Sequence, residues 1–423
     1  MTACRPFWLG TVQRRTVARM ASDHLGDRLA HLRRLAELTQ EGLAEASGVS
    51  VDVVRKLEQQ RKHSARLPTL HALARGLNVE LTALLGDPPA VPSTGDAEPP
   101  ELVAVRRAIM PPLFAPPVPA DGADRLSLPM LRAEIAEAWS LYHRADFGRV
   151  MAVLPEIVAD ARLAAAVGPG DSRRQGQHAL GKALQLGGHL SIRLGKTDLG
   201  LSSLERAIAA ADASEDPLLS GMVCNSVAWA YQRQNRLDDA QGLAVRAAET
   251  VEREHVASAE SLRVWGGLVM SAATSTARGG DYDGAADMML TAEKATARLA
   301  RMAAPADGRM VSVFSRSSVR IERVRLAVQH ARPEEALALA RTTRLSADTP
   351  LSWRTWLLLD VARAYTDLGD AAGAVASLEK LQRAAPGWLR HHTLAVSVVA
   401  DLWAGPARPP GLRKLATILG VAG

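Results

Sequence analysis

The chain has few of the residues that build strands, disulfide scaffolds or zinc sites. Only two cysteines occur in 423 residues, and aromatic residues make up 4% of the chain. Cys4 and Cys224 lie far apart without paired-ligand spacing, which argues against both a disulfide scaffold and a zinc site. Because the β-branched and aromatic runs that strands need are also scarce, we expect an all-α fold.

Long apolar runs are missing as well. No segment reaches the length of a membrane span, and the apolar stretch near the N-terminus is too short for a signal peptide. We expect residues 1–21 to be a disordered tail, or an extension before a true start at Met20. We therefore expect a cytoplasmic protein, associated with the nucleoid when it binds DNA, and no membrane contact.

Common catalytic motifs are not found. The chain has no His-Glu-x-x-His, Gly-x-Ser-x-Gly or Gly-x-Gly-x-x-Gly sequence, which are the marks of several hydrolase and dinucleotide-binding sites. His391 and His392 are adjacent, so they point in different directions on a helix and cannot share a metal ion; we expect them at the surface. We expect no enzyme, no cofactor and no metal.

Alanine, leucine and arginine are abundant, and they favour helices because they lose little entropy on entering one. The length predicts more than one folded unit, while the net charge of +6 is too modest to indicate nucleic acid by itself. A segment rich in proline pairs separates two helical regions of the chain. We predict a compact helical unit at residues 22–86, a proline-rich linker at 87–125 with a short helix near 101–110, and a long helical domain at 126–423.

A short helix–turn–helix sequence pattern recurs in that long domain. A helix ends, a turn follows, and a second helix begins on small residues. The Gly or Asn of such a turn supplies a left-handed helix cap, and the next Asp caps the following helix. The copies are spaced 38 to 51 residues apart, which predicts about six helical hairpins and a terminal helix near Leu412–Leu419. The turns begin at Ala145, Gly195, Asn235, Gly280, Ala331 and Gly369.

The most informative segment runs from Leu38 to Glu58. Thr39 is expected to cap one helix, Gly48 to make a tight turn, and Ser50 to cap a second helix. Val54 and Leu57 would bury that second helix and leave its other face outward. Two short helices that cross steeply, the second with its N-terminal turns exposed, fit the major groove of B-DNA.

Residues Leu25 to Gly86 resemble the lambda-repressor-like (Xre) helix-turn-helix domain. The resemblance rests on the TQ..LA...GVS run that begins at Thr39, on Glu58, and on the L..LA..L.V....LL ending. The resemblance implies five helices and double-stranded DNA as a partner, with Gln40 contacting a phosphate or bracing the recognition helix. Gln59–Lys62 departs from the family, which often has Gly or Asn there. The implied DNA-binding residues are Thr39, Gln40, Ser50, Val51, Asp52, Arg55, Lys56, Arg61, Lys62 and Arg66.

Asp52 has two interpretations. Its carboxylate could accept a hydrogen bond from a cytosine amine, or it could stabilise the helix N-terminus as an acid in the first turn. We favour the second.

The long domain resembles tetratricopeptide repeats, with Trp or Tyr on the first helix of a hairpin and Ala on the second. It is similar to actinobacterial regulators that join such repeats to this DNA-binding domain, through Glu101–Arg107, Trp139–Tyr142 and Leu359–Asp370. More distantly, the layout resembles the peptide-pheromone receptors of Gram-positive bacteria. The expected fold is thus an all-α, five-helix helix-turn-helix domain followed by a divergent α-solenoid.

First helices line the concave surface of tetratricopeptide repeats, so polar residues on them are candidate ligand contacts. Asn225 could both donate to and accept from an extended peptide backbone, although a capping or solvated role is equally plausible. Arginines on such helices could bind a carboxylate. The candidate ligand-binding residues are Asn225, Trp229, Gln232, Arg263, Arg316 and Arg320.

We therefore expect a sequence-specific transcriptional regulator. It should be a homodimer, because one short helix-turn-helix reads too few bases for useful specificity. Its repeats would hold the dimer contacts, sense a peptide, small molecule or protein signal, or do both. The alternative is an interaction adaptor whose repeats capture a partner protein, with the helix-turn-helix only localising or dimerising it.

Overall fold

The computed structural model describes most of the chain beyond its N-terminal segment. It covers residues 25–36, 38–60, 65, 67–77, 79, 81–85, 98–113, 127–167, 169–255, 258–302, 313–390 and 392–421. The expected tail at 1–21 and most of the expected linker lie outside these residues. Over the described ranges every regular element is a helix, so the predicted all-α fold is confirmed.

Five short helices form an N-terminal unit around one apolar core. Leu29, Leu43, Leu57, Leu73 and Leu84 are each fully buried in it. The first and third helices cross closely at a glycine, because a methyl group at Gly26 would collide with the backbone carbonyl of Leu57. The helices are α1 (Leu25–Leu35), α2 (Gln40–Ser47), α3 (Val51–Glu58), α4 (Leu67–Gly76) and α5 (Leu81–Leu85).

Helix α6 (Pro100–Ile109) lies where the sequence predicts a short helix within the proline-rich segment. Pro100 stands at its start, where a missing N–H has no cost. Leu102, Val105 and Ile109 face the core of the first repeats and are buried there, so α6 packs on the repeats.

Six helical hairpins follow, and together they form what we call the repeat region. In order, they are α7 (Leu128–His143) with α8 (Phe147–Ala166), α9 (Gly170–Arg193) with α10 (Thr197–Ala213), and α11 (Pro217–Arg233) with α12 (Leu237–His255). Next come α13 (Ala259–Arg278) with α14 (Tyr282–Leu299), α15 (Arg316–Gln329) with α16 (Pro333–Thr342), and α17 (Leu351–Asp367) with α18 (Ala371–Ala384).

The predicted turns separate the two helices of every hairpin. Each of the six turn residues has a positive φ, including Ala145 at 62° and Ala331 at 55°. The following acid then caps the next helix in three hairpins, because the side chains of Asp146, Asp281 and Asp370 accept a hydrogen bond from a backbone N–H in its first turn. The sequence pattern therefore located the hairpin turns correctly.

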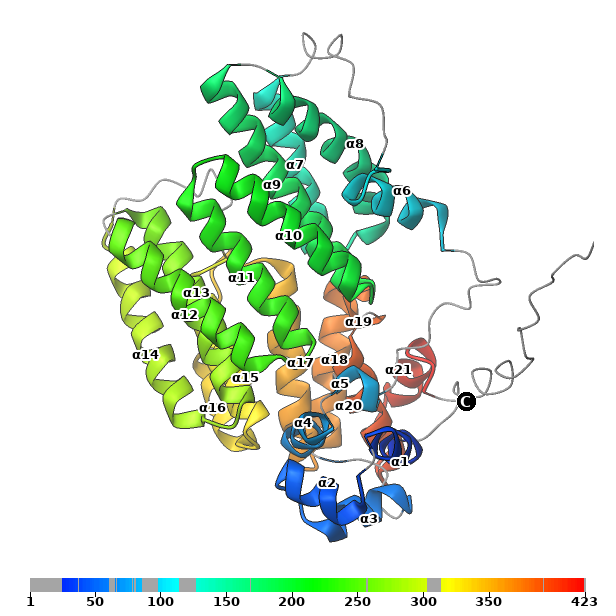
Figure 1. Ribbon diagram of the computed structural model, residues 1–423. Coiled ribbons are helices and arrows are strands. Elements are labelled where there is room, and N and C mark those ends of the chain that lie inside the picture. The colour runs from blue at the N-terminus through cyan, green and yellow to red at the C-terminus, as the bar shows by residue number, and fades with distance from the viewer. Residues whose placement is uncertain are drawn as a thin grey trace, which may run out of the picture.

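The repeat region curves until its last hairpin meets its first (Figure 1). His143 Nδ1 of α7 lies 3.0 Å from the Ser352 hydroxyl of α17. The chain then continues through α19 (Pro386–Arg390), α20 (Thr393–Ala404) and α21 (Leu412–Ile418), the last in the place of the predicted terminal helix. Trp388 of α19 is completely buried among the residues of the first hairpin.

His392 was expected at the surface, and that expectation is wrong. Its residue is only 3% exposed, because the ring lies against the indoles of Trp356 and Trp388. The closure of the repeat region buries this position, which an adjacent-histidine pattern does not reveal. His391 lies outside the described residues.

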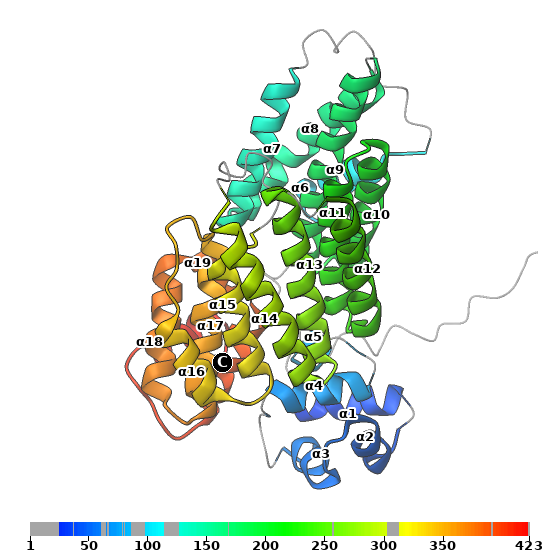
Figure 2. The same ribbon diagram turned by 90° about the vertical axis from the view of Figure 1, so that its left-hand side faces the viewer.

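The N-terminal unit docks on the repeat region through α4 and α5, while α2 and α3 lie at the far edge of the molecule (Figures 1 and 2). Arg75 Nη1 of α4 donates a hydrogen bond of 2.6 Å to the carbonyl of Gly279, in the turn after α13. Leu81 of α5 packs against an apolar cluster of α15 and α16 that includes Val324 and Leu337. No helix in the described ranges is long and apolar enough to cross a membrane.

Candidate functional site

Helices α2 and α3 are joined by a tight turn whose local chemistry follows the sequence. Thr39 Oγ1 accepts a hydrogen bond of 2.9 Å from the N–H of Gly42, which caps α2. Gly48 ends that helix with φ of 68°, a conformation that suits glycine. Ser50 occupies the N-cap position of α3, although its hydroxyl makes no capping hydrogen bond.

The outer face of α3 carries charge. Asp52, Arg55 and Lys56 are exposed, whereas Val54 and Leu57 are completely buried beneath them. Asp52 pairs with Lys56 at 2.7 Å along the helix. Arg55 lies 3.7 Å from Glu41 of α2, and both partners are about half exposed or more, so this pair holds the side chain only weakly.

A partly buried ion pair braces α3 from behind. Arg33 of α1 donates two hydrogen bonds, of 2.7 and 2.9 Å, to the carboxylate of Glu58 at the end of α3. Gln40 Nε2 donates to the same carboxylate at 2.7 Å, so in this structure Gln40 braces α3. Burial opposes ionisation of Glu58, but the hydrogen bonds from Arg33 and Gln40 prevail and hold its pKa below the ordinary value.

Three of the implied DNA-binding residues, Arg61, Lys62 and Arg66, lie outside the described residues. Thr39 and Ser50 are exposed and Val51 is half-buried, and they lie at the N-terminal ends of α2 and α3.

A family model for a helix-turn-helix domain matches residues 24–85. This range spans all five helices of the N-terminal unit. Residues 24–85 are a helix-turn-helix domain.

Comparisons beyond the helix-turn-helix domain are looser. No curated protein matches the chain. Among solved structures, a Rap protein in complex with competence and sporulation factor is similar at 10% identity, with a TM-score of 0.43, over 70% of this chain and 87% of that one. BtubC from P. vanneervenii is similar at 17% identity, with a TM-score of 0.38, over 66% of this chain and 95% of that one.

The repeat region holds a second candidate site, a partly open cavity of about 480 Å³. Its lining comes mainly from the first helices of all six hairpins, α7, α9, α11, α13, α15 and α17, together with Trp388 of α19. Five tryptophans contribute to it. They are Trp139, Trp229, Trp353, Trp356 and Trp388.

Half of the predicted ligand-contact residues line this cavity. Asn225, Trp229 and Gln232 of α11 all do so. Arg263 of α13, and Arg316 and Arg320 of α15, do not belong to its lining, and Arg316 is exposed. Arg316 and Arg320 lie on the side of α15 away from Glu322 and Arg325. Arg263 shares a face of α13 with Gly267 and Met270 but is not part of the lining.

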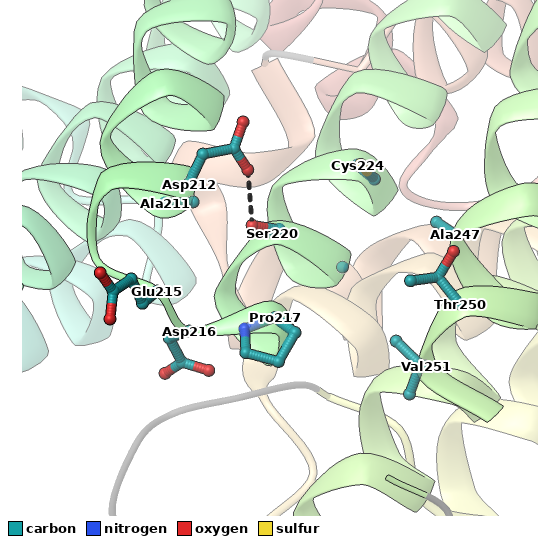
Figure 3. A pocket seen from close by; sticks show the side chains of 11 residues that line it. Ala211, Asp212, Glu215, Asp216, Pro217, Ser220, Cys224, Ala247, Thr250 and Val251 are labelled. Carbon is teal, nitrogen blue, oxygen red and sulfur yellow. Dashed lines mark hydrogen bonds between the residues drawn. The ribbon is translucent and has the colours of Figure 1, made fainter. Parts of the chain in front are cut away.

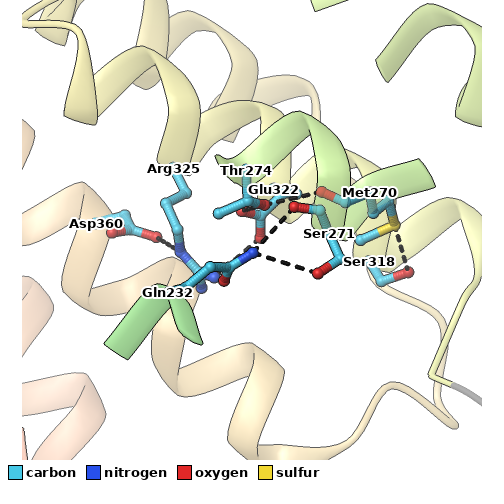
Figure 4. Close-up of polar contacts among 8 residues, drawn as sticks. All are labelled: Gln232, Met270, Ser271, Thr274, Ser318, Glu322, Arg325 and Asp360. Carbon is cyan, nitrogen blue, oxygen red and sulfur yellow. Dashed lines mark hydrogen bonds and ion pairs between the residues drawn. The ribbon is translucent and has the colours of Figure 1, made fainter. Parts of the chain in front are cut away.

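Polar contacts tie the cavity walls together (Figure 4). Gln232 Nε2 of α11 donates to the Ser271 carbonyl of α13 at 2.9 Å. One turn further along α13, Thr274 donates to Glu322 of α15 at 2.9 Å, and Glu322 accepts from Arg325 at 2.9 Å. Gln232 and Glu322 are therefore already engaged within the protein.

Arg325 also lies 3.4 Å from the carboxylate of Asp360 on α17. Burial raises the pKa of Asp360 to about 7, with Glu322 adding to the rise and Arg325 opposing it. Glu322 and Asp360 therefore both form ion pairs with the guanidinium of Arg325.

Helix α9 supplies cavity residues that the sequence analysis missed. Lys182, Gln185, His189 and Arg193 follow one another at helical spacing along a single stripe. This stripe of polar side chains on a helix otherwise rich in Gly, Ala and Leu was the available signal. Lys182 Nζ is buried, donates to Gln185 at 3.0 Å, and lies 5.1 Å from the centre of the Trp139 ring.

The run Gly176–Lys182 has the Gly-x-x-x-x-Gly-Lys spacing of a phosphate-binding loop. It is no such loop, because the whole run lies inside α9 and Ala183 follows where the loop requires Ser or Thr. Lys182 belongs to the cavity instead.

The two histidines of the cavity are neutral. Burial, with Arg193, His143 and Lys182 nearby, lowers the pKa of His189 to about 3. Burial and Lys182 lower the pKa of His143 to about 4. The imidazole of His189 stacks on Trp229 with ring centres 4.8 Å apart and accepts or donates one hydrogen bond at Ser226, 2.9 Å away.

Another pocket, of about 460 Å³, lies between α10, α11 and α12 of the repeat region (Figure 3). Asp212, Glu215 and Asp216 stand at one side of it and Cys224 at another. Burial, and to a lesser extent Asp212, raises the pKa of the Cys224 thiol to about 11, so the sulfur stays protonated and unreactive. Among the described residues no group of His, Cys, Asp and Glu could hold a metal ion.

Proposed function

We propose that the chain is a sequence-specific DNA-binding transcriptional regulator. The observation that carries this proposal is the exposed charged face of α3 within a helix-turn-helix domain. Arg55 and Lys56 are held on a helix whose opposite face is buried and whose end is braced by Glu58. Such a helix can enter the major groove without reorganising its own domain.

The docking of the domain supports the same conclusion. Helices α4 and α5 contact the repeat region, whereas α3 lies at the opposite edge (Figure 2). A DNA duplex can therefore approach α3 without meeting the repeats.

The repeat region would mediate dimerisation and sense the signal. Helix α15 supports the second role, because Glu322 and Arg325 near its middle line the cavity and its far end contacts α4. A ligand that shifts α15 would thereby move the helix on which the DNA-binding domain rests. Such a ligand controls the protein to the extent that it binds one arrangement better than the other.

Selection of bound sequences from a random duplex library tests the proposal. Purified full-length protein should enrich a palindrome whose half-sites lie about one helical turn apart. Binding without enrichment, lost at higher salt, would mean only attraction to phosphates. It would favour an adaptor whose repeats capture a partner protein.

A further inference from the structure

The ring of helices limits what can occupy the cavity. Because α7 meets α17 through His143 and Ser352, the inner helices surround the cavity, which is partly open to the outside. A volume of about 480 Å³ is within the range of sites for small organic ligands. The occupant expected from size alone is a single small molecule.

In the described part of the cavity wall, the buried polar atoms that lack a hydrogen-bond partner are all donors. Among the described residues that line it, the buried side-chain atoms without a hydrogen-bond partner are Trp139 Nε1, Arg193 Nε and Arg325 Nη2. All three are donors. Buried donors without partners are costly, so this wall favours a ligand that brings acceptors.

The distribution of charge points to an anion. Lys182, Arg193 and Arg325 line the cavity, and the two carboxylates next to it, Glu322 and Asp360, both pair with Arg325. Arg193 makes no ion pair with any acid in the described ranges. Positive charge therefore exceeds negative charge around the space.

Arg193 is surrounded by aromatic rings. Its guanidinium carbon lies 4.6 Å from the centre of the Trp388 ring, 5.5 Å from that of Trp229 and 5.9 Å from that of Trp356. Aromatic faces attract a cation, but each contributes less than a fully hydrogen-bonded carboxylate does. Because Arg193 already fills the place of a cation among these rings, a cationic ligand is disfavoured.

We propose that the cavity binds a small organic anion with a flat aromatic body, whose acidic group meets the Arg193 guanidinium and whose ring lies among the tryptophans. The proposal names the class of signal and rests on the sensing role proposed above for the repeat region. The stacked pair of His189 and Trp229 offers a flat wall for such a ring.

Two matched fluorescent probes test the charge requirement on the full-length protein. Anilinonaphthalenesulfonate carries a sulfonate, and phenylnaphthylamine has the same aromatic body without it. We expect the sulfonate to bind at least tenfold more tightly, with energy transfer from the cavity tryptophans to the probe. Equal affinities of the two probes would overturn the proposal.

Arg193→Met tests the position. This variant should weaken binding of the sulfonate at least tenfold and leave binding of the neutral probe unchanged. Arg193→Lys keeps a cation but lacks the planar guanidinium, so its affinity for the sulfonate should lie between those of the wild type and Arg193→Met. The control is Arg206→Met, which removes an exposed arginine from the outer helix α10. If Arg193→Met and Arg206→Met bind the sulfonate equally well, the acidic group is not held by Arg193.

The outcome is separable from DNA binding. Loss of probe selectivity with normal selection of a DNA sequence would overturn the ligand class alone. Selective probe binding without any DNA sequence preference would overturn the proposed regulator and leave the cavity assignment standing.

Discussion

The indole Nε1 of Trp388 donates a hydrogen bond of 3.4 Å to the backbone carbonyl of His143, across 245 positions of sequence. This contact joins α19, beyond the last hairpin, to the end of α7 in the first. Tyr142 and Phe147 meet the same indole edge to face, with ring centres 6.5 and 5.7 Å away. The two ends of the repeat region are thus joined by a buried aromatic cluster, of which Tyr142 and Trp388 also line the cavity.

Removal of that indole should open the ring of helices. Trp388→Ala leaves a large void at a completely buried position, so we expect a loss of about 3–5 kcal/mol in the free energy of unfolding. Trp388→Phe keeps most of the packing and should cost less. Denaturant titration measures both, and equal stabilities of the two variants would show that the indole does not hold the ends together.

The brace behind α3 should control the stability of the DNA-binding domain. Arg33→Met leaves Glu58 largely buried with only Gln40 as a partner, so a loss of about 3 kcal/mol is expected. Hydrogen exchange across α1 to α3 would report it. Arg34→Met removes a neighbouring exposed arginine and serves as the control. Equal exchange in the two variants would show that Arg33 does not brace α3.

Acid should also weaken this brace. Glu58 has a lowered pKa in the folded chain, so its contribution is fully present above its ordinary value of 4.5 and is lost as pH falls through the lower folded value. In Glu58→Gln the stability of α1 to α3 should change less with pH below about 4.5. Parallel acid curves for this variant and the wild type would contradict the assignment.

His189 should respond to acid at higher pH. Its folded pKa of about 3 lies below the ordinary 6.5, so the unfolded chain binds a proton that the folded chain excludes. Stability should therefore fall as pH drops below about 6.5, by up to about 1.4 kcal/mol per pH unit. His189→Gln should show a shallower decline in denaturant titrations at several pH values, and an unchanged slope would mean that His189 is protonated when folded.

Arg75 should hold the helix-turn-helix domain on the repeats. Loss of its 2.6 Å hydrogen bond to Gly279 in Arg75→Ala should speed hydrogen exchange in α4 and α5 about tenfold. The fold of α1 to α3 should be unaffected, since Arg75 faces the repeats. Unchanged protection of α4 and α5 would mean that Leu81 and its apolar neighbours suffice for docking.

Local sequence patterns predicted the local structure well. Thr39, Gly48 and the six hairpin turns follow from capping and turn preferences that act within a few residues. Even Ala145 and Ala331 take the left-handed conformation, because the next helix must reverse there.

Contacts between helices far apart in the sequence could not be predicted from those local patterns. Trp388 reaches His143, and Arg193 reaches Trp388, only because the accumulated curvature of six hairpins brings them together. That curvature depends on small rotations at each interface, which helical periodicity does not encode. Arg316 and Arg320, by contrast, lie outside the cavity lining because they are on the other side of α15, which helical periodicity does encode.

The most direct test of DNA recognition by α3 is a binding titration with the sequence enriched from the random library. The double variant Arg55→Ala with Lys56→Ala should bind it at least tenfold more weakly and with a shallower dependence on salt. Arg173→Ala with Arg174→Ala is the matched control, an exposed pair of adjacent arginines at the start of α9. If both double variants bind like the wild type, α3 does not read DNA.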